Sequence, residues 1–213
     1  MTRSAWPDGL TSAIRAAWQT PWKAGNEVSR IASWPLLRLY FALHGVPWGS
    51  GWRIYGLPII QRHRWSRISI GGEFEMRNSR ASSPLGVQHP CILATRSSAA
   101  VIEIGSRVGV TGGVICAVRR IAIGDRVMIG ANCTIVDTDF HPLDSARRKD
   151  QPASGESDPV IIEDDVFLGM HVMVLKGSRV GRGSVVGAGS VVTGEIPPHV
   201  IAAGHPARVL RRL

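Results

Sequence analysis

The clearest pattern in the chain is an aliphatic residue at every sixth position, from Ile162 to Val192. The positions that keep this step are Ile162, Leu168, Val174, Val180, Val186 and Val192, and Gly169, Gly181 and Gly187 each follow one of them. An α-helix repeats every 3.6 residues and a strand every two, so neither accounts for a period of six. The pattern predicts a parallel β-helix, in which each six-residue unit supplies one short face and a turn. A β-sandwich rich in Val and Gly is the alternative, which six aliphatics in register disfavour.

The same rhythm is less regular earlier in the chain. It begins near Ile68 and continues, with interruptions and one shift of phase, at Ile92, Ile104, Val110, Cys116, Ile123, Ile129 and Ile135. Asn132 is expected as a turn residue in the left-handed conformation. Between Ile135 and Ile162 the chain is polar and rich in Pro and Ser, which predicts a loop over residues 141–159. Long loops of this kind are usually functional or disordered.

The first 65 residues differ from the rest in composition. They contain all seven tryptophans and eight Lys or Arg against two acidic residues, whereas the net charge of the whole chain is +9. We expect short helices over 10–19 and 27–44, the second interrupted or begun near Pro35. The domain prediction is an extension over 1–65 and a β-helix over 66–213. The extension either covers the open end of the β-helix or makes a weak contact with an anionic membrane, and the two roles are compatible.

Composition also bounds the surroundings of the protein. The residues MTRSAWPDGL lack the apolar core of a signal peptide, and no apolar run is long enough to span a bilayer. We therefore expect a cytoplasmic protein, with the cytoplasmic face of the membrane as a further location. The three cysteines, Cys91, Cys116 and Cys133, have no metal-type spacing and are expected to be buried free thiols. The repeats carry no basic stripe with interleaved aromatics, so nucleic acid is not an expected partner.

Residues 161–213, IIEDDVFLGMHVMVLKGSRVGRGSVVGAGSVVTGEIPPHVIAAGHPARVLRRL, resemble the carboxy-terminal half of the hexapeptide-repeat acyltransferases. The resemblance covers roughly residues 104–213 and is greatest to the maltose/galactoside O-acetyltransferase branch. It implies a left-handed parallel β-helix, a homotrimer, and acetyl transfer from acetyl-CoA without a metal.

The resemblance also implies a catalytic base. His141 matches the histidine of the family's His-Pro motif, and an imidazole suits removal of a proton from a hydroxyl. Asp137 and Asp139 either orient His141 or contact the acceptor, or they are turn residues that cap backbone N–H groups. The polar residues that contact the acceptor in the family are replaced here by residues 110–113 and Ala117. The same chemistry on a different hydroxyl is therefore expected.

The donor side of the family's site is better matched. The family's Trp-Ile-Gly motif corresponds to Phe167, Leu168 and Gly169, which makes the Met170 N–H the expected oxyanion donor. Gly187 and Ala188 offer a surface without bulky side chains for the pantetheine arm, and Thr193 matches a family contact to the nucleotide end of coenzyme A. Gly194 replaces the family's neighbouring lysine, so Arg208 and Lys176 are expected to supply positive charge to the phosphates. A solvated surface role is the alternative for Lys176.

The resemblance thus implies a coenzyme A-dependent O-acetyltransferase that acts on a sugar, in surface polysaccharide or lipopolysaccharide synthesis. An N-acetyltransferase acting on an amino sugar and a noncatalytic scaffold are the alternatives. A zinc enzyme using His141, His171 and His199 is a further rival, but the zinc-binding pattern known for this fold is not present.

Overall fold

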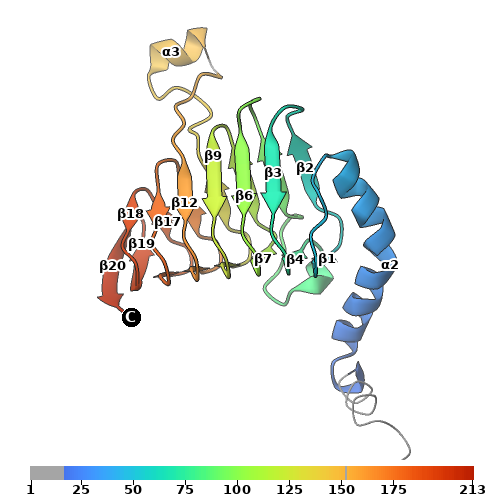
Figure 1. Ribbon diagram of the computed structural model, residues 1–213. Coiled ribbons are helices and arrows are strands. Elements are labelled where there is room, and N and C mark those ends of the chain that lie inside the picture. Colours follow the sequence, from blue (N-terminus) through green and yellow to red (C-terminus); the bar gives the residue numbers. More distant parts are fainter. Residues whose placement is uncertain (1–16, 152) are drawn as a thin grey trace, which may run out of the picture.

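The chain winds as a left-handed β-helix with three flat sides, which a computed structural model describes for residues 17–151 and 153–213 (Figure 1). Each side is one sheet, and neighbouring strands within a sheet are three strands apart along the chain, except for the consecutive strands β19 and β20. All pairings are parallel except the last, between β19 and β20. Successive strands therefore lie on successive sides of a prism.

We call the three sides sheets A, B and C. Sheet A contains β1 (Arg53–Tyr55), β4 (Glu75–Arg77), β7 (Gly109–Thr111), β10 (Met128–Ile129), β13 (Phe167–Leu168), β16 (Val185–Val186), β19 (Val200–Gly204) and β20 (Ala207–Arg212). Sheet B contains β2 (Ile59–Arg62), β5 (Ile92–Thr95), β8 (Val114–Ala117), β11 (Thr134–Val136), β14 (Met173–Val174) and β17 (Val191–Val192). Sheet C contains β3 (Arg67–Ile70), β6 (Val101–Ile104), β9 (Arg120–Ile123), β12 (Val160–Ile162), β15 (Arg179–Val180) and β18 (Glu195–Ile196).

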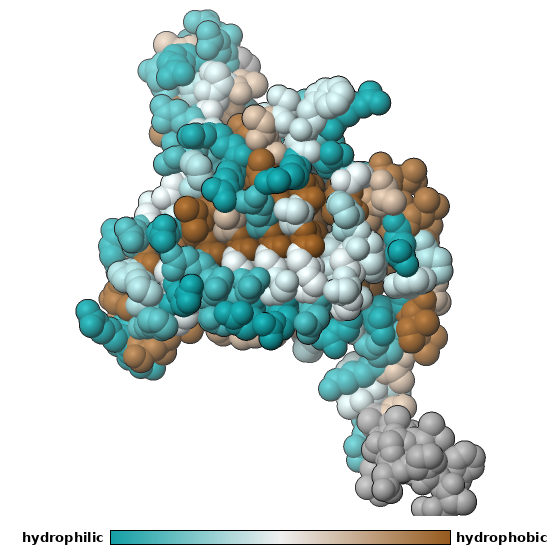
Figure 2. Space-filling view, in the orientation of Figure 1, coloured by the Kyte–Doolittle hydropathy of each residue, from teal (hydrophilic) through white to brown (hydrophobic). Residues whose placement is uncertain are grey.

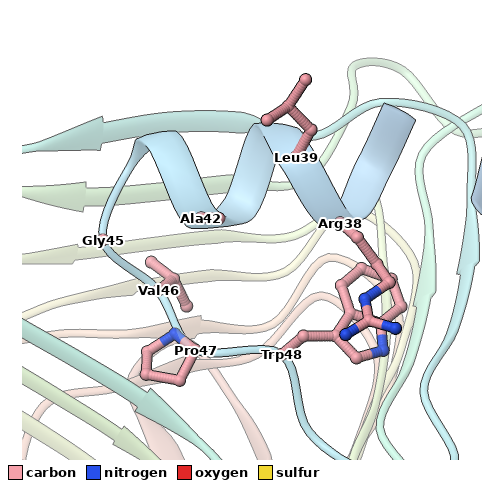
Figure 3. A pocket seen from close by; sticks show the side chains of 7 residues that line it. All are labelled: Arg38, Leu39, Ala42, Gly45, Val46, Pro47 and Trp48. Carbon is pink, nitrogen blue, oxygen red and sulfur yellow. The ribbon is translucent and has the colours of Figure 1, made fainter. Parts of the chain in front are cut away.

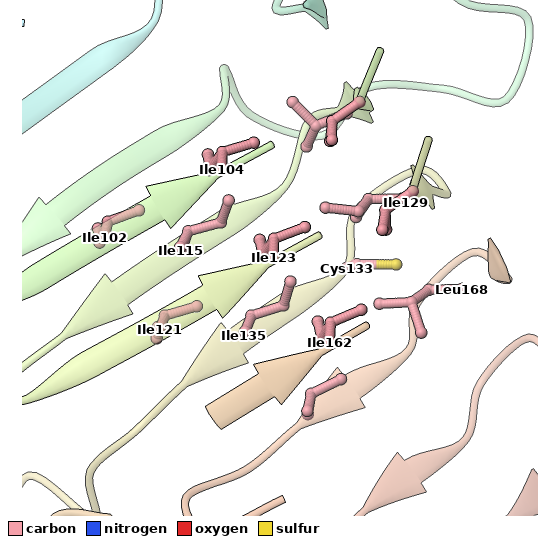
Figure 4. Close-up of a cluster of buried hydrophobic side chains, with 14 of the residues drawn as sticks. Ile102, Ile104, Ile115, Ile121, Ile123, Ile129, Cys133, Ile135, Ile162 and Leu168 are labelled. Atoms are coloured by element: carbon pink, nitrogen blue, oxygen red, sulfur yellow. The ribbon is translucent and has the colours of Figure 1, made fainter. Parts of the chain in front are cut away.

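The interior of the prism is a stack of aliphatic side chains (Figure 4). All six residues of the predicted ladder from Ile162 to Val192 are buried there, each at most 1% exposed. In the earlier coils the predicted phase was wrong at two positions. Leu93 and Ile115 point inward, whereas Ile92 and Cys116 belong to a cluster on the outer face of sheet B. The reason is that neighbouring residues of a strand point to opposite faces, and both of each pair are apolar.

The turns between sheets form three corners, which we call corners AB, BC and CA. Corner AB follows each strand of sheet A, and its residues Asn132, His171 and Gly189 all have positive φ, of 60°, 57° and 70°. The left-handed conformation expected for Asn132 is thus confirmed. The long loop leaves corner BC between β11 and β12, and it contains the short helix α3 (Ser145–Asp150) (Figure 1).

The amino-terminal part is a helix that covers one end of the prism. Helix α2 (Pro21–Leu43) is continuous through Pro35 and begins earlier than the predicted 27–44. Its residue Phe41 packs in a cluster of aromatic rings with Trp48 and Trp52, and Trp52 in turn contacts Phe74 of the first coil. This packing supports the expected covering role.

Other tryptophans of the same segment lie on the surface. Trp18, Trp22, Trp34 and Trp65 are 42–84% exposed. Strands β1 and β2 already pair with the β-helix at Arg53 and Ile59, ahead of the boundary expected after residue 65. Of the helix expected over 10–19, only residues 17–19 are described, and they are helical. No helix in the described part of the chain is long and apolar enough to cross a bilayer.

Candidate active site

The loop that carries His141 starts and ends as a pair of extended segments. Thr138 and Ser157 form an antiparallel bridge. Asp139 N–H donates to the Glu156 carbonyl at 2.9 Å, and Asp158 N–H donates to the Asp137 carbonyl at 2.9 Å. These bonds anchor the base of the loop to the prism, so the position of His141 is fixed relative to corner BC.

Asp137 is the buried anchor of this loop. Its side chain is 0% exposed, and its carboxylate accepts three backbone N–H groups, from Val118, Arg119 and Arg120, at 2.7–2.8 Å. Three charge-assisted hydrogen bonds occupy both oxygens. Of the two roles considered for Asp137, this contact set is the capping of a turn, and burial leaves no surface for an acceptor.

The backbone immediately before His141 is tightly turned. Phe140 has a φ of 60°, which is uncommon for a bulky residue, and its N–H donates to Thr138 Oγ1 at 3.0 Å. The His141 N–H donates to the Asp139 carbonyl at 2.6 Å. Gly155 lies against this turn, since a Cβ on Gly155 would stand 2.5 Å from the backbone nitrogen of His141. Strained backbone of this kind is often found at functional sites.

Asp139 and Lys176 form an ion pair beneath the loop. Lys176 Nζ lies 3.0 Å from Asp139 Oδ2 and 3.3 Å from Glu156 Oε2. The hydrogen bond to Asp139 raises the pKa of Lys176, and Glu156 adds to the effect. The ammonium group, which the sequence assigns to the phosphates of coenzyme A, is therefore already paired with two loop carboxylates.

Four of the residues predicted to bind acetyl-CoA, Gly169, Met170, Gly187 and Ala188, lie at corner AB. Gly169 is followed by Met170, whose carbonyl accepts the Gly189 N–H at 2.9 Å. A Cβ on Gly169 would lie 2.6 Å from the Ala188 nitrogen, and one on Gly130 would lie 2.7 Å from the Met170 nitrogen. The backbones of successive coils are thus in direct contact at this corner, and they form a narrow surface with few side chains.

The other residues predicted to bind acetyl-CoA lie at three different places. Phe167 is 39% exposed on the outer face of sheet A. Arg208 pairs with Ala203, and Ala203 lies against Gly187, which places Arg208 at the end of corner AB. Thr193 instead follows β17 at corner BC, the corner of Lys176.

The structure thus separates the predicted site residues into two groups on one chain. His141, Asp139, Lys176 and Thr193 belong to corner BC, whereas Met170, Gly169, Gly187, Ala188 and Arg208 belong to corner AB. Sheet B lies between the two corners. Its outer face carries the ladder Ile59, Ile92, Val114, Thr134, Met173 and Val191 in successive registered strands.

Histidines and cysteines do not form a second reactive centre within the described residues. His141, His171 and His199 lie at three different corners, and no group of three or more His, Cys, Asp or Glu among the described residues could hold a metal. All three cysteines are free and buried. Burial raises the pKa of Cys91 to about 12 and that of Cys133 to about 11, so their thiols are protonated at neutral pH.

Two residues of this site were missed by reasoning from the sequence. Gly155 and Glu156 lie in the returning half of the loop, where no periodicity fixes a partner. The Gly in the run Ser154 to Ser157 was the available signal, because glycine permits close approach of two backbones.

Two segments of the chain match known protein families. The family described as bacterial transferase hexapeptide (six repeats) matches residues 159–194, and the hexapeptide repeat of succinyl-transferase matches residues 120–136. These segments are hexapeptide repeats of the bacterial transferase type, and the family resemblance seen in the sequence is confirmed.

Several proteins with sequences or structures similar to this chain are acetyltransferases. The galactoside O-acetyltransferase of Escherichia coli is 44% identical over 95 residues, which are 44% of each chain. A 2,3,4,5-tetrahydropyridine-2,6-dicarboxylate N-acetyltransferase of Brevibacillus brevis is 44% identical over 63 residues, 30% of this chain and 26% of the relative. A solved galactoside acetyltransferase in complex with coenzyme A has a TM-score of 0.53 and 27% identity, covering 98% of this chain and 84% of that one. The matched segment thus spans less than half of the length of these curated relatives.

Proposed function

We propose that this protein is a coenzyme A-dependent O-acetyltransferase that moves the acetyl group of acetyl-CoA to a sugar hydroxyl. The observation that carries the proposal is the presence of two complementary groups of residues at the two edges of sheet B. A rigidly anchored loop presents His141, and corner AB offers a backbone N–H beside a surface with few side chains. The likeness to a galactoside acetyltransferase with bound coenzyme A supports the choice of donor.

The reaction follows from the roles of these groups. His141 removes the proton of the acceptor hydroxyl while the hydroxyl oxygen attacks the carbonyl carbon of the thioester. The Met170 N–H stabilises the negative oxygen of the tetrahedral intermediate. Collapse of the intermediate expels the coenzyme A thiolate, which takes a proton from the imidazolium. No acyl-cysteine is formed.

The two groups of residues complete a site only between neighbouring copies. We propose a closed homotrimer, in which the loop of one subunit lies over corner AB of the next. The support is the outer face of sheet B, which lies between the two corners. Ala94, Cys116 and Val136 are buried there against Ile92, Val114 and Leu175, and Met173 is still 40% exposed. By contrast, the outer face of sheet C carries the ion pairs of Glu103 with Arg67 and Arg120.

The acceptor we propose belongs to surface polysaccharide or lipopolysaccharide synthesis. Residues 110–113 and Ala117 replace the polar acceptor contacts of the family, which favours a hydroxyl other than that of a free sugar. Transfer to the amine of an amino sugar is the second candidate, because N-acetyltransferases share the repeat region.

A screen of acyl-CoA donors against sugar and amino-sugar acceptors, with products identified by mass spectrometry, tests this function. We expect acetyl-CoA and a sugar hydroxyl to give product. The substitution His141→Ala should lower turnover roughly 10²–10⁴ fold with little change in coenzyme A affinity. His199→Asn is the matched control, since His199 is at corner CA and asparagine accepts its positive φ. Full turnover by His141→Ala would contradict the assignment.

A further inference from the structure

Helix α2 presents an apolar side to the solvent rather than to the protein. At 100° per residue, one unbroken strip of its surface contains no polar side chain. The residues of this strip, which we call the α2 outer face, are Pro21, Ala24, Gly25, Val28, Ile31, Ala32, Pro35, Leu36, Leu39, Ala42 and Leu43. Its five large aliphatic residues are 57–75% exposed. Figure 2 shows the corresponding hydrophobic patches along the α2 side of the molecule.

The opposite side of the helix is fixed to the β-helix. Leu37 and Phe41 are buried, 2% and 0% exposed. Asn26 Nδ2 donates to the Ala81 carbonyl at 2.9 Å, and Tyr55 Oη donates to Glu27 Oε1 at 2.5 Å. Rotation of the helix to bury its outer face would break these contacts. The outer face is therefore held outward by the fold, and its five aliphatic residues form a continuous apolar surface of a kind that marks an interaction site.

The chain in and next to this helix carries a positive net charge. Between residues 17 and 65 it has six basic residues, Lys23, Arg30, Arg38, Arg53, Arg62 and Arg64, and one acidic residue, Glu27. Glu27 is paired with Arg30, and Arg53 is paired with Glu75. The Arg38 guanidinium lies 4.8 Å from the centre of the Trp34 ring. A second copy of this surface would bring like charges together, whereas an anionic surface would be attracted.

A cavity of about 540 Å³ opens beside the same face (Figure 3). Its walls are the apolar residues Leu39, Ala42, Val46, Pro47 and Trp48, with Arg38 at one side. This open hollow extends the apolar surface of α2 towards Trp48, with the positive charge of Arg38 at its edge.

We propose that the α2 outer face docks on a bilayer containing anionic lipid, with the helix lying in the plane of the interface. Trp22 and Trp34, 61% and 42% exposed, are suited to the headgroup region, where tryptophan is enriched. In the trimer proposed above, a threefold axis along the prism would bring three such faces to one end of the assembly. That multiplication rests on the proposed trimer, but the docking of a single helix does not.

Co-sedimentation of the full chain with phosphatidylcholine vesicles, with and without phosphatidylglycerol, tests the proposal. We expect binding to the anionic vesicles at low salt and a decline as salt is raised, because screening shortens the reach of the charges. The double substitution Val28→Glu with Leu39→Glu should lower partitioning by more than about tenfold, since two apolar anchors are lost and two negative charges are added.

The matched control is Leu210→Glu. Leu210 is on β20 at the other end of the prism, and its side chain is 65% exposed, similar to those of Val28 and Leu39. It should bind like the unchanged protein. Circular dichroism and light scattering should show that the double variant keeps its fold and mass. Absence of binding to anionic vesicles, equal binding by the double variant, or a larger assembly that this variant dissociates would each overturn the proposal. The last result would mean that the face contacts a second copy.

Discussion

Asp137 and Asp139 are two residues apart and have different tasks. Asp137 accepts three backbone N–H groups in full burial, whereas Asp139 pairs with Lys176 at the edge of the loop. Asp137→Asn should lower the free energy of unfolding by about 2–3 kcal/mol, because a neutral amide cannot keep all these bonds. Asp139→Asn should cost under about 1 kcal/mol, as for other part-exposed ion pairs. Urea unfolding of both variants measures this difference, and equal losses would contradict it.

Gly155 lies against the backbone turn that precedes His141, the proposed base. Gly155→Ala would place a Cβ 2.5 Å from the His141 nitrogen, so the turn must shift. We expect turnover to fall at least about tenfold, since small displacements of a catalytic group are costly. The thermal midpoint should change little, because the loop adds little to the core. Ser154→Ala is the control in the same loop. Unchanged turnover in Gly155→Ala would show that the contact does not position the base.

The sequence predicted the repeating elements, but it could not predict all the contacts within the candidate site. A period of six specifies the inward ladder from Ile162 to Val192 without any long-range information. The period fails at Ile92 and Cys116, where sheet B is apolar on both faces and the two phases look alike. It also cannot place Gly155 against His141, because loop contacts do not follow a period. The proline rule predicted an interruption or a beginning near Pro35, but α2 continues through Pro35 and packs through Leu37 and Phe41.

Successive coils of the β-helix are in close contact at corner AB. Gly169→Ala should destabilise the β-helix by about 1–3 kcal/mol, because its Cβ would lie 2.6 Å from the Ala188 nitrogen in a closely packed corner. Gly194→Ala, at a position with no atom within 4 Å, should be neutral or slightly stabilising. Thermal unfolding of the two variants compares them directly. Tolerance of Gly169→Ala would mean that the corner can relax.

The whole molecule is organised around sheet B, whose apolar outer face separates the two groups of site residues. Neither corner of one chain contains both a base and an oxyanion donor. A subunit alone would therefore lack a complete site, and the proposed trimer would supply it. A threefold axis along the prism of the proposed trimer would place the three α2 outer faces at one end of the assembly and the His141 loops at its sides. Catalysis and surface docking would then use different parts of the assembly.

Mixed trimers test the shared site most directly. His141→Ala removes the base and leaves corner AB intact, whereas Ala188→Trp fills exposed corner AB and leaves His141 intact. Each variant alone should be inactive as a homotrimer. Subunits mixed in equal amounts, by unfolding and refolding together, should recover about a quarter of the unchanged activity, because each mixed trimer contains one complete site of three. Acetyl transfer to the acceptor found in the screen is the measurement. Mixed trimers that form, as shown by native mass spectrometry, yet remain inactive would contradict the account.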